Sequence, residues 1–316
     1  MKTVSLARNA MATRFEMVLH GEDELALRAV GEEAFDEISA LAAQFNFYGA
    51  DSEICRINAE AAFGPVPVEP GLFRLLQEAK CVHELSGGAF DITVAPLMRC
   101  WGFSGGEYRV PSPGELAKAR ECVGMDLVHL DTKNITVQFE RPGVRIDLGA
   151  IGKGFALDIA DEIVREADIT SALIHGGTST VCAIGSPPGK DFWRVAIEHP
   201  GADIPKYKRL LAVAELNDES LSVSAGWGKA FEENGVSYGH VLDPRCGQPT
   251  QNTLLAAVAL PSGTAADAWS TAFLVSGVAG PVALGQVGES VRSLLLLPNG
   301  DSGFRTINNG FESAPS

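Results

Sequence analysis

Apolar side chains recur along the chain with two spacings, one typical of strands and one typical of helices. Residues 14–20 alternate between apolar and polar positions, which predicts a strand near the start of the chain. Residues 23–45 repeat apolar positions at helical spacing and predict a long amphipathic helix. The same criteria predict further helices over residues 71–86, 111–123 and 154–166, and further strands over residues 127–130, 135–139, 144–148, 171–175, 193–197, 210–216, 221–223, 238–242, 256–260 and 293–297.

Turn-forming residues mark the ends of several elements. Ser112 followed by Pro113 predicts a helix start, because serine is a favoured N-cap and proline is favoured in the first turn. Residues 87–103 begin with two glycines and contain Pro96, so we expect a loop that leads into a short helix. Strands occur in runs and mix with helices. The pattern therefore predicts an α+β fold rather than a regular β-α-β alternation.

Composition narrows the class of protein. The 316 residues, 46% of them apolar, suffice for one large domain or two closely packed lobes. No run of about 18 apolar residues predicts a membrane span, and charges in the first twenty residues do not fit a secretion signal. The six cysteines form no CxxC pair, which argues against a zinc site and gives no disulfide framework. We therefore expect a cytoplasmic protein in a reducing compartment.

The net charge of −15 makes nucleic acid an unsuitable partner, because phosphate neutralisation needs clustered lysine and arginine. It does not exclude a phosphate-bearing small ligand. A strand ending at Asp147 enters a glycine-rich turn, and Lys153 lies at the start of the following helix, where backbone amides favour an anion. The segment matches neither standard nucleotide-binding glycine motif, so an ordinary glycine turn before a helix is the alternative.

Asp267 and Thr271 are four residues apart in a helical pattern, so their oxygens share one side of the helix. With a carbonyl from the Ala150 turn they would suit a hard cation such as Mg²⁺. The alternative is a capping box in which Thr264 caps the helix and Asp267 occupies its third position.

His240 precedes a tight turn that contains Asp243 and Pro244, which would hold its imidazole on an ordered loop. An ordinary strand histidine is the alternative. His175 is a second candidate, although the two glycines after it more simply mark a turn or a close backbone approach.

Three further segments have ligand-facing candidates. Asp91 is the single carboxylate in the apolar segment 87–103, which either walls a planar heterocycle or forms a buried loop around Phe90 and Trp101. Met11 and Tyr48 are ordinary loop residues when each is considered alone.

Taken together and in order, these segments resemble the ApbE family of FAD:protein FMN transferases. The resemblance covers nearly the whole chain. It is carried by MAT at 11–13, YGADSEICRIN at 48–58, GGAFDITVAPLMRCWGF at 87–103, IDLGAIGKGFALD at 146–158, HGG at 175–177, YGHVLDPRCGQP at 238–249 and ADAWSTAF at 266–273.

The resemblance implies a single α+β domain over residues 1–316, with two lobes and a ligand cleft between them. It implies an enzyme that cleaves FAD with Mg²⁺, attaches the FMN part to a threonine hydroxyl of an acceptor protein and releases AMP. In that scheme His240 is the catalytic base and Ala150, Asp267, Ser270 and Thr271 belong to the metal site. The expected FAD-lining residues are Met11, Tyr48, Ala89, Phe90, Asp91, Asp147, Lys153 and Val241.

Two segments depart from the family pattern. Cys246 replaces the usual threonine in DPRCG, and SVSAGWG at 222–228 departs from the usual Thr-Ser-Gly. Both departures put the acceptor preference in doubt more than FAD binding. An Mg²⁺-dependent FAD pyrophosphatase and a non-catalytic flavin-binding protein are the alternative functions.

Overall fold

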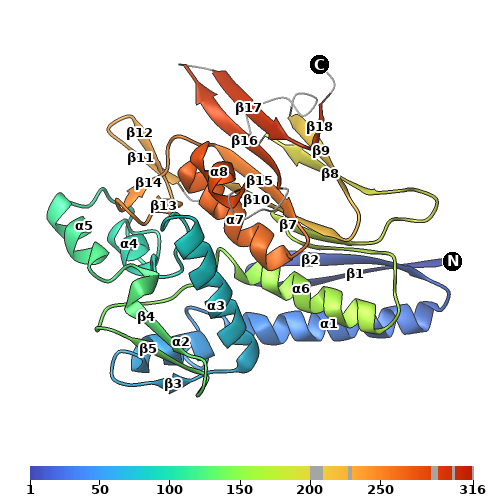
Figure 1. The fold of residues 1–316 in the computed structure, drawn as a ribbon, viewed down its shortest axis with the longest axis horizontal. Helices are drawn as coiled ribbons and strands as arrows, with labels where there is room; N and C mark the ends of the chain where they lie inside the picture. Colours follow the sequence, from blue (N-terminus) through green and yellow to red (C-terminus); the bar gives the residue numbers. More distant parts are fainter. Residues whose placement is uncertain (200–208, 227–229, 286–290, 301–302, 315–316) are drawn as a thin grey trace.

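The structure is a computed structural model that describes residues 1–199, 209–226, 230–285, 291–300 and 303–314. At its centre lies an eight-stranded sheet in which every neighbouring pair is antiparallel (Figure 1). In order across the sheet, the strands are β1 (Lys2–Ala10), β2 (Thr13–Gly21), β6 (Ala172–Gly176), β7 (Thr180–Ile184), β10 (Glu219–Ala225), β15 (Leu255–Leu260), β16 (Arg292–Asn299) and β17 (Gly303–Asn309).

One face of this sheet is covered by three helices, α1 (Glu24–Gln44), α6 (Gly152–Glu166) and α7 (Gly263–Ser276). The N-cap of α1 is Asp23, whose carboxylate accepts hydrogen bonds from amides of the first turn. The buried side chains of α1 form one stripe along the helix, as its apolar spacing requires. The long helix predicted near the start of the chain is confirmed.

The other face of the central sheet packs against a small sheet of β8 (Trp193–Glu198), β9 (Leu210–Leu216) and β18 (Glu312–Ser313). Alternation along β15 separates the two interfaces. Ala256 and Val258 belong to the core under the helices, whereas Leu255 and Ala257 belong to the core between the sheets.

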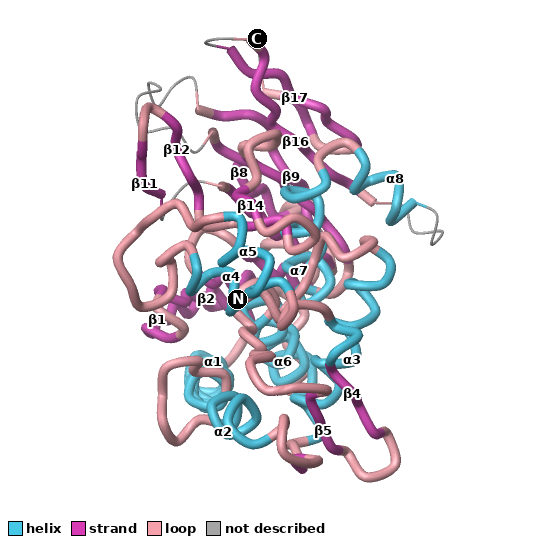
Figure 2. The backbone as a smooth tube through the Cα atoms, turned by 90° about the vertical axis from the view of Figure 1, so that its left-hand side faces the viewer, coloured by secondary structure: helices cyan, strands magenta, loops and turns pink. Residues whose placement is uncertain are grey.

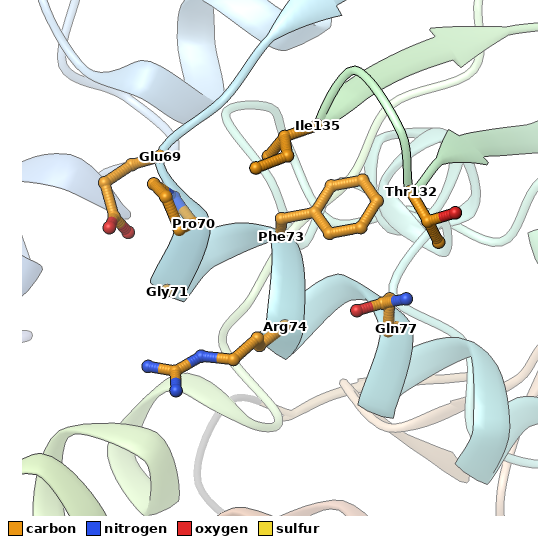
Figure 3. A pocket seen from close by; sticks show the side chains of 8 residues that line it. All are labelled: Glu69, Pro70, Gly71, Phe73, Arg74, Gln77, Thr132 and Ile135. Carbon is orange, nitrogen blue, oxygen red and sulfur yellow. The ribbon is translucent and has the colours of Figure 1, made fainter.

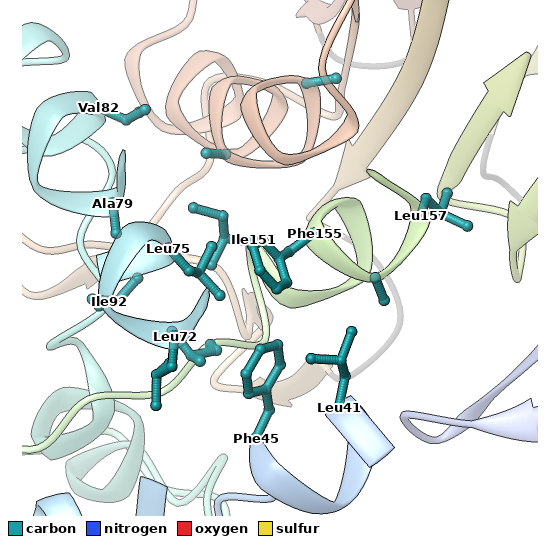
Figure 4. Packing of buried hydrophobic residues seen from close by; sticks show 14 of the residues in the cluster. Leu41, Phe45, Leu72, Leu75, Ala79, Val82, Ile92, Ile151, Phe155 and Leu157 are labelled. Atoms are coloured by element: carbon teal, nitrogen blue, oxygen red, sulfur yellow. The ribbon is translucent and has the colours of Figure 1, made fainter. Parts of the chain in front are cut away.

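A second lobe lies on the left of Figure 1 and shares the apolar core of the first. Figure 4 shows Leu72 and Leu75 of this lobe packed near Phe45, Ile151 and Phe155, and the rings of Phe45 and Phe155 are 5.9 Å apart. This packing fixes the turn from which α6 begins. The elements of the lobe are α2 (Glu53–Glu60), β3 (Val66–Pro67), α3 (Pro70–Leu85), α4 (Ala95–Cys100), α5 (Pro113–Arg120), the 3-10 helix η1 (Met125–Leu127), β4 (Val128–Asp131) and β5 (Thr136–Phe139).

The remaining elements lie outside both larger sheets. Two hairpins pair β11 (Ala230–Glu233) with β12 (Val236–Gly239) and β13 (Leu242–Asp243) with β14 (Gln248–Pro249), and α8 (Ala279–Gly285) follows α7. Figure 2 shows α1, α2, α3 and α6 in the lower half of the molecule and most of the strands above them. The α+β architecture expected from the sequence is thus confirmed.

Two predicted strands differ from the structure. Residues 144–148 pair with no strand among the described residues; instead the side chain of Asn58 bonds both backbone groups of Ile146, and the Asp147 amide donates to the Ile92 carbonyl. The predicted strand over residues 238–242 is split, since β12 ends at Gly239 and β13 begins at Leu242. His240 therefore lies in the connection between two short strands.

In the described part of the chain, no helix is long and apolar enough to cross a bilayer.

Candidate active site

A cavity of about 1020 Å³ is bounded by the start of α6, by α7, by β8 and by strands of the central sheet. This volume matches that of pockets for large small-molecule ligands, which range up to about 1000 Å³. Most of the residues predicted for the site meet on its wall, although they come from distant parts of the chain. Those residues are Ala89, Phe90, Asp91, Asp147, Ala150, Lys153, His240, Val241, Asp267 and Thr271.

Met11, Tyr48 and Ser270 were predicted for the site but do not line this cavity. Met11 lies in the turn between β1 and β2 with a φ of 47°. Tyr48 is 71% exposed, and its hydroxyl is 3.2 Å from the hydroxyl of Ser104. Ser270 is fully buried and donates a hydrogen bond to the carbonyl of Asp267.

Asp267 is almost fully buried, with an exposure of 3%. Its Oδ2 accepts a hydrogen bond from the Gly154 amide at 3.1 Å and lies 3.6 Å from Lys153 Nζ. Its Oδ1 accepts hydrogen bonds from Ser222 Oγ at 3.1 Å and from Thr180 Oγ1 at 3.4 Å. Groups from α6, β7 and β10 therefore hold the carboxylate in one orientation.

The alternative capping box of Thr264 and Asp267 is wrong. The N-cap of α7 is Ser262, whose hydroxyl accepts a hydrogen bond from the Ala265 amide. Thr264 lies inside the first turn, where its hydroxyl donates to Asp158 of α6 at 2.6 Å. The pattern misleads because a carboxylate of a neighbouring helix, and not Asp267, accepts from the first turn of α7.

The start of α6 has no side-chain cap. Its Gly154 amide is bonded to Asp267, so this amide serves a protein carboxylate rather than the anion expected from the sequence. A Cβ at Gly154 would lie 2.1 Å from the carbonyl oxygen of Gly263, which only glycine avoids. Glycine here brings α6 and α7 into contact beside the cavity.

Sequence reasoning missed Ser224, which lines the cavity, and Ser222, which is fully buried and bonds Asp267. Ser224 Oγ lies 2.7 Å from Ser270 Oγ and 3.1 Å from Thr271 Oγ1. Their segment was assigned to acceptor preference, yet both hydroxyls contact residues of the expected metal site. The alternating serines of β10 were the available signal, because a strand presents alternate residues on one face.

Asp91 forms a second polar cluster on the cavity wall. Its Oδ1 accepts hydrogen bonds from the amide and the hydroxyl of Thr93, at 2.7 and 2.5 Å. His83 Nδ1 lies 3.2 Å from Asp91 Oδ2 and 3.0 Å from the Phe90 carbonyl oxygen. Burial opposes the charged form of His83, but the hydrogen bond and charge of Asp91 outweigh it and raise the pKa of His83. The Asp91 carboxylate therefore favours the charged form of His83 beside the cavity.

His240 also lines the cavity, and its ring is 6.5 Å from that of Phe103 in an edge-on arrangement. Trp101 contacts the segments before and after His240 in the chain. Its ring is 5.3 Å from that of Tyr238 in β12, and its Nε1 donates to the carbonyl of Gly247 at 2.8 Å. The ordered loop expected around His240 is thus fixed by ring contacts as well as by its turns.

His175 also lines the cavity, although it was predicted only as a rival to His240. Its Nδ1 donates to the Gly177 carbonyl at 3.0 Å, and its Nε2 lies 3.1 Å from Glu16 Oε2. Gly177 has a φ of 65°, and a Cβ there would lie 2.3 Å from Thr13 Oγ1. The close approach expected at these glycines is therefore to the protein itself.

Cys246, the departure in the DPRCG run, is exposed and lies outside the cavity wall. In the same turn, Arg245 bonds both carboxylate oxygens of Asp243.

A smaller cavity of about 450 Å³ lies at the start of α3 (Figure 3). Phe73 and Ile135 form its apolar part, and Arg74 lies at its edge. Its carboxylate, Glu69, already caps α3 by accepting from the Leu72 amide at 2.9 Å. None of the residues predicted for the site lines this cavity, so the larger cavity is the candidate active site.

The described residues include no group of three or more His, Cys, Asp or Glu side chains placed to hold a metal ion. A metal in the larger cavity would depend on the carboxylate of Asp267 together with hydroxyl and carbonyl oxygens. Such a set is one that hard cations accept.

Several known proteins are similar to this chain. It is 31% identical over 287 residues to the FAD:protein FMN transferase of Haemophilus influenzae, covering 87% of this chain and 81% of that protein. It is 29% identical over 270 residues to the FAD:protein FMN transferase of Vibrio cholerae, covering 83% and 77%.

Solved structures agree with this similarity. The ApbE protein of Thermotoga maritima matches with a TM-score of 0.85 and 28% identity, covering 98% of this chain and 97% of that chain. The flavinyl transferase ApbE of Pseudomonas stutzeri matches with a TM-score of 0.86 and 26% identity, covering 98% and 95%. The sequence model of the ApbE family matches residues 11–290. The chain therefore belongs to the ApbE family.

Proposed function

We propose that this protein transfers the FMN part of FAD to a threonine hydroxyl of an acceptor protein and releases AMP, with Mg²⁺ as its metal. The observation that carries the proposal is the buried Asp267 carboxylate at the cavity, beside Lys153 and Thr271, in a chain similar to FAD:protein FMN transferases. The cavity of about 1020 Å³ is large enough for a dinucleotide.

The oxygen-bearing residues around Asp267 fit Mg²⁺. Asp267 offers a carboxylate oxygen, Thr271 offers a hydroxyl one helical turn later, and Ala150 lines the same cavity and offers a carbonyl. Mg²⁺ prefers such oxygen ligands and keeps places for phosphate and water. When bound, Mg²⁺ would offset the negative charge of the pyrophosphate during transfer. Ser270 would orient Thr271 indirectly, because the hydroxyl of Ser224 contacts the hydroxyls of both residues.

Lys153 supplies a positive charge beside Asp267 on the cavity wall. Its Nζ donates to the Gly149 carbonyl at 3.3 Å and lies 3.6 Å from Asp267. An ammonium group here would bind the pyrophosphate of FAD and hold it for in-line attack.

His240 accepts the proton of the acceptor threonine. The threonine oxygen forms a bond to the FMN phosphorus while the bond to the bridging oxygen breaks, and AMP leaves with that oxygen. Correct placement of such a base contributes about 10²–10⁴-fold to the rate. His240 suits this task because it lies on the cavity wall between two fixed hairpins.

The rest of FAD would lie against the side chains that the family resemblance assigns to it. Among them, Asp91 has a fixed carboxylate through Thr93 and His83, and can accept hydrogen bonds from the ligand. Met11 and Tyr48 do not line the cavity, so they would contact only a part of FAD that extends beyond it. The remaining residues proposed to contact FAD are Ala89, Phe90, Asp147 and Val241.

The test uses the purified protein with FAD, Mg²⁺ and an acceptor domain that contains a candidate threonine. Flavin fluorescence that stays on the acceptor through denaturing electrophoresis, with AMP released, supports the transfer. The matched control is the same acceptor with that threonine changed to alanine, which should remain unlabelled. FMN and AMP without labelled acceptor would mean hydrolysis, and intact bound FAD would mean a flavin-binding protein; either outcome contradicts the proposal.

A further inference from the structure

We infer that Asp158 of α6 is a positioning residue that fixes Asp267 at the cavity by holding the start of α7. The inference rests on the proposed function, because it concerns the carboxylate proposed to bind the metal. Asp158 does not line the cavity itself. Its effect would pass along one turn of helix.

The side chain of Asp158 binds the first turn of α7 through both of its oxygens. Its Oδ1 accepts a hydrogen bond from the Gly263 amide at 2.6 Å. Its Oδ2 accepts from the Ser262 hydroxyl at 2.8 Å, the Thr264 amide at 2.9 Å and the Thr264 hydroxyl at 2.6 Å. A carboxylate from one helix thus satisfies amides that the start of another helix leaves without intrahelical partners.

Asp158 holds α7 where the two helices are in backbone contact. A Cβ at Gly263 would lie 2.8 Å from Asp158 Oδ1, and a Cβ at Gly154 would lie 2.1 Å from the Gly263 carbonyl oxygen. Neither position therefore has room for a side chain. The relative position of α6 and α7 is fixed by this contact and by the hydrogen bonds of Asp158.

Asp267 lies three residues after Thr264, a rise of about 4.5 Å along the helix. It is therefore joined to the Asp158 contact by less than one turn of hydrogen-bonded helix. On the other side, Oδ2 of Asp267 accepts from the Gly154 amide of α6. α7 is thus attached to α6 at two points, and loss of the Asp158 contact would let Asp267 shift relative to Lys153 and Ser222.

Metal sites respond strongly to partners that orient their ligands. Loss of such a partner lowers metal affinity by about 10–100-fold. Removal of the Asp158 carboxylate should therefore weaken metal binding at Asp267, although Asp158 contacts neither the metal nor FAD.

The test compares Asp158→Asn with Asp161→Asn, a matched control one turn further along the same helix. Asp161 pairs with Arg165 of its own helix at 2.9 Å rather than with the first turn of α7. Mn²⁺ serves as the probe, and its dissociation constant in the presence of FAD is read from the electron paramagnetic resonance signal of the free ion. Asp158→Asn should raise this constant at least about tenfold. Asp161→Asn should change it by less than about twofold.

A folded Asp158→Asn protein with the wild-type Mn²⁺ dissociation constant would overturn the inference, as would an equal loss in Asp161→Asn. If Asp158→Asn does not fold, Thr264→Val decides the question, because it removes one hydrogen bond of Asp158 and keeps the side-chain shape. Thr264→Val should raise the constant by about fivefold, since one hydrogen bond is worth roughly 1 kcal/mol. An unchanged constant in a folded Thr264→Val protein would then contradict the inference.

Asp267→Ala separates this inference from the proposed function. If Asp267→Ala binds Mn²⁺ as the wild type does, the proposed metal site is wrong. If Asp267→Ala loses Mn²⁺ but Asp158→Asn binds it normally, the metal site stands and the inference about Asp158 fails.

Discussion

Asp267 and His240 lie on the wall of one cavity, but the protein holds them in different ways. Asp267 is buried between the helices and the central sheet, and its oxygens are bonded by groups from three elements. His240 lies between two short hairpins outside the larger sheets, and its surroundings are fixed by the ring and indole nitrogen of Trp101. The position of Asp267 thus depends on the packing of the whole domain, whereas the position of His240 depends on local contacts.

Asp267→Ala should have the largest effect. It removes the proposed metal ligand and leaves the hydroxyls of Thr180 and Ser222 and the Gly154 amide without their shared acceptor. Loss of metal assistance is worth several kcal/mol, so transfer should fall at least about 10⁴-fold at every Mg²⁺ concentration. The rate of acceptor labelling across an Mg²⁺ titration measures this, and recovery at high Mg²⁺ would show that Asp267 is not the main ligand.

His240→Asn should be severe for transfer but mild for binding. Removal of a general base lowers the rate by about 10²–10⁴-fold, while the hairpins around residue 240 keep their contacts. FAD affinity, followed by flavin fluorescence quenching, should stay within about threefold of wild type. A labelling rate near that of the wild type would remove His240 from the mechanism.

Trp101→Phe tests whether the position of His240 depends on local contacts. The substitution keeps an aromatic ring beside Tyr238 but removes the hydrogen bond to the Gly247 carbonyl. A lost hydrogen bond of roughly 1 kcal/mol should lower kcat by about fivefold. The Mg²⁺ concentration for half-maximal rate should not change. A shift in that concentration would mean that the Trp101 contact near His240 also affects metal binding at Asp267.

Glu78→Gln tests the burial of Glu78 in α3 and its interaction with the charge of Asp158, and it should have the smallest effect. Burial, and then the charge of Asp158, raise the pKa of Glu78 to about 7. The raised pKa means that folding favours protonated Glu78, so this contribution to stability is present below about pH 4.5 and is lost as the pH rises through about 7.

Glu78→Gln should therefore be more stable than wild type at pH 8, by less than about 1 kcal/mol because Glu78 is only partly buried. At pH 5 the two proteins should unfold at nearly the same temperature. Thermal unfolding at both pH values measures the difference, and a variant that is less stable at pH 8 would contradict the expected sign.

Several local features could be predicted because each depends on residues close together in the chain. Ser112 forms the expected cap of α5, with Glu115 completing a capping box. The long amphipathic helix over residues 23–45 followed from its apolar stripe, and the structure adds Asp23 as its N-cap. The ordered motifs likewise indicated the family, because each motif is a short run of consecutive residues.

Other features could not be predicted because they depend on distant partners. The N-cap of α7 is Ser262 and not Thr264, since Asp158, more than a hundred positions earlier, binds the first turn. Residues 144–148 belong to no strand, and the backbone groups of Ile146 bond instead to the side chain of Asn58. No spacing rule within a segment reveals such contacts.

Resemblance of its motifs to a family named residues of the cavity wall such as Asp267 and His240, and the sequence by itself determined the α+β class and many of the helices and strands. These follow from periodicity and local hydrogen bonding, which act over a few residues. Only the tertiary structure decided how the site residues are arranged. It brought Ser222 and Ser224 into contact with Asp267 and Thr271, left Tyr48 outside the cavity wall and bound the first turn of α7 to Asp158. The reason is physical: a buried polar group takes the partners that folding brings to it, whatever their distance along the chain.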